Sequence, residues 1–101
     1  MDTTDALIRN MHWAATHAEA IASIPGVFDI GVTHYNVSIL ARGDDTTVTA
    51  LRLVGETDGP SVTERTRHIL SLGADRIDYT TTDGVPVTCT VFGTTPTEET
   101  E

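Results

Sequence analysis

The feature that most constrains the fold is a strict alternation of apolar and polar residues over positions 85–91. Side chains with a period of two share one face of a strand, so this stretch predicts a strand with one buried side. The preceding loop, 82–84, fits a three-residue turn closed by Gly84 in the left-handed conformation. That turn places Ile77 and Tyr79 on the same face as the apolar residues, whereas a two-residue turn would separate them. We therefore predict a hairpin with a single apolar face.

Two residues of this hairpin carry further expectations. Pro86 falls on the outward face and has no N–H to donate to a neighbouring strand, so we expect the last strand to lie at an edge of the sheet or to begin irregularly. Cys89 is the only cysteine and falls on the inward face. A lone thiol at such a position is expected to be a small core side chain, because burial raises its pKa and blocks access to it.

The first part of the chain has the periodicity of a helix. Its apolar positions follow the spacing of one helix face; they are Leu7, Met11, Ala14, Ala18 and Ile21, with Ile8, Ala15 and Ala22 beside them. Thr4 can cap the start, and Pro25-Gly26 ends the helix because proline disfavours helix in the residue before it. We predict a helix over about residues 5–23 that buries this face.

The middle of the chain predicts two paired strands and a less certain segment. In residues 27–41 the parity of the apolar positions changes, so a four-residue loop at 33–36 is needed to keep them on one face. The predicted opposing pairs are Val32 with Val37, Ile30 with Ile39, and Phe28 with Ala41. Residues 46–54 favour a strand through their Thr and Val content, although a short helix is the alternative.

The sequence SVTE at residues 61–64 has the form of a capping box. It predicts a second helix from Ser61, closed by Gly73, with Arg65, Arg67 and His68 outside or flanking. Together these elements predict an α+β fold: an antiparallel sheet of about five strands with two helices on one face, in the order α-β-β-β-α-β-β. We expect one domain over residues 1–93 and an acidic, disordered tail over 94–101.

Composition limits the partners. The formal charge is −9, with 15 acidic residues, 6 arginines and no lysine, which favours basic partners and disfavours direct binding to nucleic acid. No apolar run is long enough to cross a membrane, and no secretory signal opens the chain, so we expect a cytoplasmic protein without a membrane partner. Arginine without lysine, with abundant Ala, Gly, Thr and Val, is typical of a GC-rich bacterium or its phage.

The reactive side chains do not form a recognisable catalytic or metal-binding motif. His12 and His17 are five residues apart and point away from each other on a helix, so they are not a metal pair. The glycines lack the spacing of a phosphate-binding loop. We therefore expect no catalytic residue, no metal and no cofactor.

Partner binding is the role that the sequence supports best. Trp13 and His17 share a helix face next to Asn10, and Trp is enriched among interface anchors, although a contact at the margin of the core is the alternative. His34 and Tyr35 are expected in the loop between the first two strands. We predict Trp13, His17, Asn10, His34 and Tyr35 as partner-binding residues.

Several short motifs are spread over residues 5–93: IPGV, the pair DD, LGA, and DGVPVTCTVFG near the end. In this layout the chain resembles small α+β proteins of actinobacteria and their phages. The resemblance implies a cytosolic accessory protein and carries no catalytic residue.

The leading hypothesis is a non-enzymatic protein-interaction module, a homodimer encoded by a phage and directed at a host protein or an assembly. One alternative is an acidic mimic of nucleic acid that inhibits a DNA-binding protein, which requires carboxylates in a row. The other is an enzyme or small-ligand binder, which requires an apolar pocket with converging polar groups.

Overall fold

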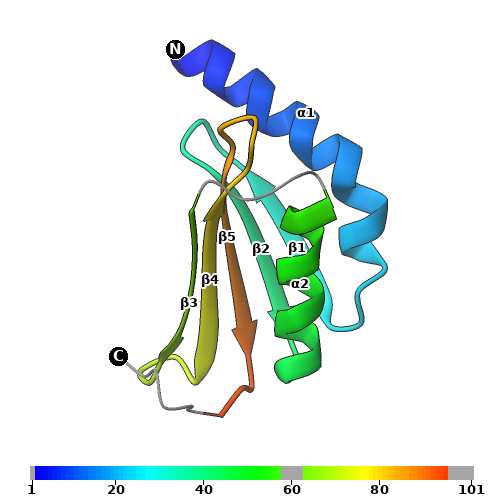
Figure 1. Ribbon diagram of the computed structural model, residues 1–101, viewed down its shortest axis with the longest axis vertical. Coiled ribbons are helices and arrows are strands. Elements are labelled where there is room, and N and C mark those ends of the chain that lie inside the picture. The colour runs from blue at the N-terminus through cyan, green and yellow to red at the C-terminus, as the bar shows by residue number, and fades with distance from the viewer. Residues whose placement is uncertain (1, 58–62, 96–101) are drawn as a thin grey trace.

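The computed structural model describes residues 2–57 and 63–95. These residues form two helices and five strands in the order α-β-β-α-β-β-β (Figure 1). The elements are α1 (Thr3–Ala22), β1 (Val27–Val32), β2 (Val37–Arg42), α2 (Asp45–Thr57), β3 (Thr63–Ile69), β4 (Ala74–Thr80) and β5 (Pro86–Phe92). The fold is α+β with a five-stranded sheet, as predicted, but the predicted order of elements is wrong.

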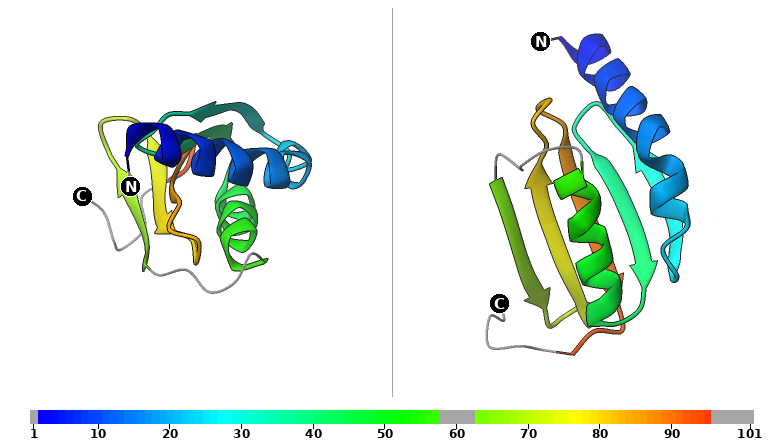
Figure 2. Two further views of the ribbon diagram at one scale, coloured as in Figure 1. Left: turned by 90° about the horizontal axis from the view of Figure 1, so that it is seen from above. Right: turned by 45° about the vertical axis from the view of Figure 1, so that its right-hand side comes forward.

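The strands form one mixed sheet in the order β1-β2-β5-β4-β3 (Figure 2). β2 and β5 run parallel, and the other neighbouring pairs run antiparallel. The predicted antiparallel sheet is wrong because α2 carries the chain from β2 to the far edge, so that β5 returns beside β2 in the same direction. The predicted edge position of the last strand is wrong for the same reason. Pro86 is tolerated in this central strand because it is the first residue of β5.

The β4–β5 hairpin has the predicted register. Ile77 lies opposite Cys89 and Tyr79 opposite Val87, and all four side chains are buried on one face. Gly84 has a φ of +86°, the left-handed conformation that the three-residue turn requires. The alternation of apolar residues therefore sets this hairpin as expected.

The β1–β2 hairpin follows the prediction except at its open end. Two predicted pairs are confirmed, Val32 with Val37 and Ile30 with Ile39. A bulge between Val27 and Asp29 places Val27, and not Phe28, opposite Ala41. The Phe28 side chain is consequently 58% exposed on the edge strand.

The preference for a strand over residues 46–54 is wrong, because this segment lies in α2. Asp44 precedes the helix, and its Oδ1 accepts hydrogen bonds from the Thr46 N–H at 3.0 Å and the Thr46 hydroxyl at 2.6 Å. The buried side chains recur with helical spacing; they are Thr47, Val48, Leu51 and Val54. The cap at Asp44 and the apolar side of α2 outweigh the strand propensity of its Thr and Val residues.

The predicted helix over residues 61–73 is also wrong, because Thr63–Ile69 is the edge strand β3. Ser61 and Val62 lie outside the described residues. β3 pairs antiparallel with β4 along its whole length, from Thr63 opposite Thr80 to Ile69 opposite Ala74. The local capping signal is overridden by this pairing, and Gly73, at a φ of +59°, serves the turn of a hairpin and not a helix end.

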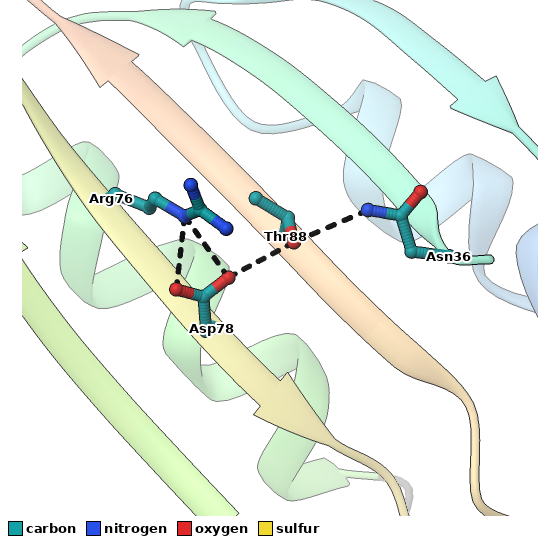
Figure 3. A network of polar contacts seen from close by, with 4 residues as sticks. All are labelled: Asn36, Arg76, Asp78 and Thr88. Atoms are coloured by element: carbon teal, nitrogen blue, oxygen red, sulfur yellow. Dashed lines mark hydrogen bonds and ion pairs between the residues drawn. The ribbon is translucent and has the colours of Figure 1, made fainter.

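α1 begins and ends within two residues of the prediction. Asp2, and not Thr4, caps it, and its carboxylate accepts a hydrogen bond from the Asp5 N–H at 2.8 Å. Both helices pack against the same face of the sheet, α1 over β1 and β2 and α2 over β4 and β5. Among the described residues no helix covers the opposite face, which Figure 3 views with both helices behind the sheet. We call it the open sheet face.

Candidate functional site

α1 buries a different face from the predicted one. Its buried residues are Asn10, Trp13, Ala14, His17 and Ile21. Only Ala14 and Ile21 belong to the predicted apolar face, and Met11 is 54% exposed. Burying the large ring of Trp13 removes more apolar surface from water than burying an alanine would, so the helix turns this side to the sheet.

Three of the predicted partner-binding residues therefore lie in the interior: Asn10, Trp13 and His17 are 0%, 3% and 8% exposed. The Asn10 amide donates to the Thr33 carbonyl at 2.9 Å, and its oxygen accepts from Arg9 Nε at 3.0 Å. The Trp13 and His17 rings stack with centroids 4.3 Å apart, and His17 Nδ1 lies 2.8 Å from the Trp13 carbonyl oxygen. In the single chain these residues fix α1 on the sheet, and their contact with a partner stays a prediction.

The other two predicted residues lie in the loop between β1 and β2. The rings of His34 and Tyr35 are 3.9 Å apart, and Tyr35 is 75% exposed. The Thr33 hydroxyl accepts from the N–H groups of Tyr35 and Asn36, each at 3.1 Å, which holds the loop closed. Because Asn10 binds Thr33, this loop and the first half of α1 meet at one end of the molecule.

The rotation of α1 leaves an apolar stripe on its surface. We call the α1 stripe the five residues Ile8, Met11, Ala15, Ala18 and Ala22. Ile8 and Met11 are 59% and 54% exposed, Ala15 and Ala22 are exposed, and Ala18 is half-buried. Their spacing of three and four residues is the repeat of a coiled-coil seam. A continuous apolar stripe on the surface of a helix is typical of a site that binds another protein.

Two further features flank the α1 stripe. At its end a hollow of about 320 Å³ is lined by Ala22 and by residues of β1 that include Phe28. Along its side stand His12 and Glu19, both exposed. Neither side chain has a hydrogen bond or ion pair within the part of the chain that the structure describes. The stripe thus has an apolar hollow at one end and one potential charge pair beside it.

A second hollow, of about 370 Å³, lies between α1 and the β4–β5 turn. Its lining includes the Trp13 ring, Ile8 and Val85, with Arg9 and His12 among the polar residues. This volume suits a small ligand. The polar groups, however, do not favour one kind of ligand, because acidic and basic side chains both line the hollow. Arg9 already donates a hydrogen bond to Asn10.

A buried polar cluster that the sequence did not reveal joins β3, β4 and the segment after β5. His68 Nδ1 lies 2.7 Å from Asp75 Oδ1, and the Thr94 hydroxyl donates to the same oxygen at 3.1 Å. These residues are 2%, 6% and 8% exposed. His68 was expected outside or flanking a helix, and Thr94 in a disordered tail. Thr94 instead packs into the domain, whereas residues 96–101 lie outside the described part of the chain.

Cys89 is fully buried, as predicted. Burial, with a smaller contribution from the nearby carboxylate of Asp78, raises the pKa of its thiol to about 12. The thiolate is the nucleophilic form of cysteine, so this side chain supplies no nucleophile at neutral pH.

Within residues 2–57 and 63–95, no group of three or more His, Cys, Asp or Glu side chains is placed to hold a metal ion. In the same residues, no helix is both long and apolar enough to span a membrane. No family model, curated protein or solved structure matches the chain. The resemblance to small actinobacterial and phage proteins therefore stays a prediction.

Proposed function

We propose that the protein is a non-enzymatic interaction module that works as a homodimer paired through the α1 stripe. The observation that carries this proposal is that α1 turns two polar residues, Asn10 and His17, toward the sheet and leaves its apolar stripe in solvent. Exposed apolar side chains in a continuous row gain stability when a partner covers them.

The stripe suits antiparallel pairing with a second copy. It extends about 21 Å along the helix, from Ile8 to Ala22. When two copies cross at Ala15, Ile8 faces the partner's Ala22 and the hollow beside it. The large side chain at one end thereby fills the space left by the small side chain at the other. Alanine at the crossing point allows the two helix axes to approach to about 8 Å.

Charge supports the same arrangement. In an antiparallel pair centred on Ala15, His12 stands beside the partner's Glu19, and symmetry repeats the contact. A protonated imidazole beside a carboxylate is worth about 0.2–1 kcal/mol at an exposed site. Parallel pairing would instead place each residue beside its own copy, so the charges favour the antiparallel dimer.

The two other functions receive less support. A mimic of nucleic acid needs a row of carboxylates, but Asp75 is buried against His68, Asp29 lies on β1, and Asp83 lies in the β4–β5 turn. An enzyme needs a reactive group within reach of substrate, whereas Cys89 and His68 are both buried. A dimer that binds a host protein or an assembly, as the leading hypothesis holds, requires neither.

The proposal is tested by sedimentation equilibrium of the full chain. We expect a dimer, and we expect Met11→Glu to weaken it roughly a hundredfold or more, because each copy then buries an unpaired carboxylate in an apolar seam. Leu53→Glu is the matched control, since Leu53 is 50% exposed and belongs to α2 and not to the stripe. Circular dichroism checks that both variants are folded.

A charge exchange tests the orientation. His12→Glu should weaken the dimer roughly threefold to tenfold, and adding Glu19→Lys in the same chain should restore it, because each new carboxylate meets the partner's new ammonium group. A wild-type chain that stays monomeric at high concentration, or a dimer weakened equally by Leu53→Glu, would contradict the proposal.

A further inference from the structure

β1 is an open edge of the sheet. It is the outermost strand on the side that α1 covers, and among the described residues it pairs with β2 alone (Figure 2). The Thr33 N–H donates to the Asn36 carbonyl at 2.9 Å, which fixes the hydrogen-bonding pattern of the hairpin. Alternation from this bond turns the N–H and C=O of Gly31 toward β2 and those of Ile30 and Val32 outward. Two donors and two acceptors therefore have no strand partner in the described chain.

The residues of β1 allow a further strand to pair with it. Proteins protect exposed edges with charged residues and proline, but β1 has no proline and no basic residue, and Asp29 is its one charge. The other edge strand, β3, carries Glu64, Arg65 and Arg67. The bulge of β1 lies before Asp29, so residues 29–32 continue in regular pairing. Of the two edges, β1 is therefore the one suited to accept another strand.

Gly31 suits the centre of such a contact. A Cβ at Gly31 would meet nothing within 4 Å, so the backbone is open there. If two antiparallel β1 strands face each other across Gly31, Ile30 exchanges two hydrogen bonds with the partner's Val32, and symmetry repeats the exchange. The two glycines then form the closer kind of pair, with Cα atoms about 4.5 Å apart. The same register places Asp29 opposite the partner's Thr33, so the two Asp29 carboxylates do not face each other.

This pairing and the α1 stripe fit one two-fold axis. α1 is held to β1 at both ends, because the Asn10 amide donates to the Thr33 carbonyl and the last turn of α1 shares a hollow with the start of β1. Ala15 lies about 7.5 Å along the helix from Asn10, and Gly31 lies about 7 Å along the strand from Thr33. Ala15 is therefore level with Gly31. An axis through Gly31 also passes the crossing point of the α1 pair.

The lateral distances agree as well. Neighbouring strands lie about 4.8 Å apart, and α1 lies over β1 and β2. The helix axis is therefore about 5 Å from a two-fold axis that runs midway between two β1 strands. The two α1 axes then lie about 10 Å apart, close to the 8–10 Å at which helices pack. Ile30 and Val32, which are partly buried against the core, lie below this helix pair and gain cover from it.

We infer that β1 pairs antiparallel with β1 of a second copy across Gly31, so that two five-stranded sheets form one continuous sheet beneath the α1 pair. This inference rests on the proposed α1 dimer, and it adds to that dimer a second set of contacts and a defined register. A strand from a different protein would satisfy the same backbone groups but would leave the α1 stripe uncovered. A second copy covers both features at once.

Amide hydrogen exchange followed by NMR tests the pairing in the full chain. At a concentration about a hundred times the Kd of the dimer, we expect the Ile30 and Val32 amides to exchange roughly tenfold more slowly in wild type than in Met11→Glu. These amides meet water only when the two copies separate. Thr66 is the matched control, because alternation along β3 points its N–H out of the other edge. Its rate should be the same in both proteins.

A pair of substitutions at Gly31 tests the register. Gly31→Glu places two carboxylates directly opposite each other across the two-fold axis, and like charges in that position destabilise a sheet. We expect it to weaken the dimer roughly threefold to tenfold relative to Gly31→Gln, as measured by sedimentation equilibrium. Gly31→Gln is the matched control because it adds a side chain of the same size without charge. Both side chains have room in the single chain.

The results separate this inference from the proposed function. A wild-type dimer whose Ile30 and Val32 amides exchange as fast as in Met11→Glu would overturn the strand pairing and leave the α1 dimer standing. Equal dimer affinities of Gly31→Glu and Gly31→Gln would overturn the register across Gly31. A wild-type chain that is monomeric in sedimentation would overturn the α1 dimer and the strand pairing together.

Discussion

Asn10, His68 and Asp75 are polar residues that lie in the interior because each finds a hydrogen-bond partner on a neighbouring element of the fold. The Asn10 amide reaches Thr33, 23 residues away, and His68 meets Asp75 across the β3–β4 hairpin. A buried polar group without a partner costs about 1–3 kcal/mol, so these contacts decide whether such residues can be buried at all. They also decide which side of α1 and of β3 faces the core.

One substitution measures how much the hydrogen bond between Thr94 and Asp75 contributes to stability. Thr94→Val keeps the shape of the side chain and removes the hydroxyl that donates to Asp75, and it should lower the free energy of unfolding by about 1 kcal/mol in urea. Thr95→Val is the matched control, because Thr95 is exposed; it should change stability by less than about 0.5 kcal/mol. Equal effects of the two variants would show that Thr94 is not part of the packed domain.

At the scale of elements, α1 and the two hairpins could be predicted because their signals are local. Helical spacing, the Pro25-Gly26 stop and the Gly84 turn act within a few residues of each other. The middle of the chain could not be predicted in this way. Residues 45–57 become a helix because Asp44 caps its start and because its apolar side packs on β4 and β5. β3 becomes a strand because β4 offers it a complete set of pairing partners, despite a helix-capping motif at its start.

The start of α2 provides a test that depends on pH. The Thr46 hydroxyl and N–H donate to the Asp44 carboxylate and hold its pKa below the usual 3.8. Folding therefore favours the charged form. Its contribution is present above the unfolded pKa and is lost as pH falls through the lower, folded pKa. Asp44→Ala should lower Tm at neutral pH, and its difference from wild type should shrink as pH approaches about 3.

Asp45→Ala is the control for this prediction, because Asp45 lies one residue further on and its carboxylate makes no hydrogen bond within the described chain. It should have a smaller effect on Tm that varies less with pH. Thermal unfolding followed by circular dichroism at several pH values measures both variants. A constant difference in Tm between Asp44→Ala and wild type down to about pH 3 would show that the carboxylate does not cap the helix.

At the scale of the whole molecule, the two sides of the sheet carry different kinds of residue. The α1 stripe belongs to the helical side, and Arg65, Arg67 and Arg76 belong to the open sheet face. The sequence predicted Met11 and Ala18 as part of the apolar face of this helix, with Ile8, Ala15 and Ala22 beside it, but it assigned that face to the core. It placed Arg65 and Arg67 on a helix, where they would not oppose Arg76. The burial of Trp13 decides which side of α1 faces the sheet, and pairing with β4 decides that residues 63–69 form a strand.

The net charge of the chain predicts how the dimer responds to salt. Two copies of net charge −9 repel each other over distances comparable with the Debye length, about 10 Å at 0.1 M salt. Screening should therefore strengthen a dimer held by apolar side chains, because this repulsion outweighs the exposed contacts of His12 with the partner's Glu19. Sedimentation equilibrium in a series of NaCl concentrations measures this effect. A dimer that dissociates as salt rises would mean that charge pairs, and not the apolar stripe, hold it together.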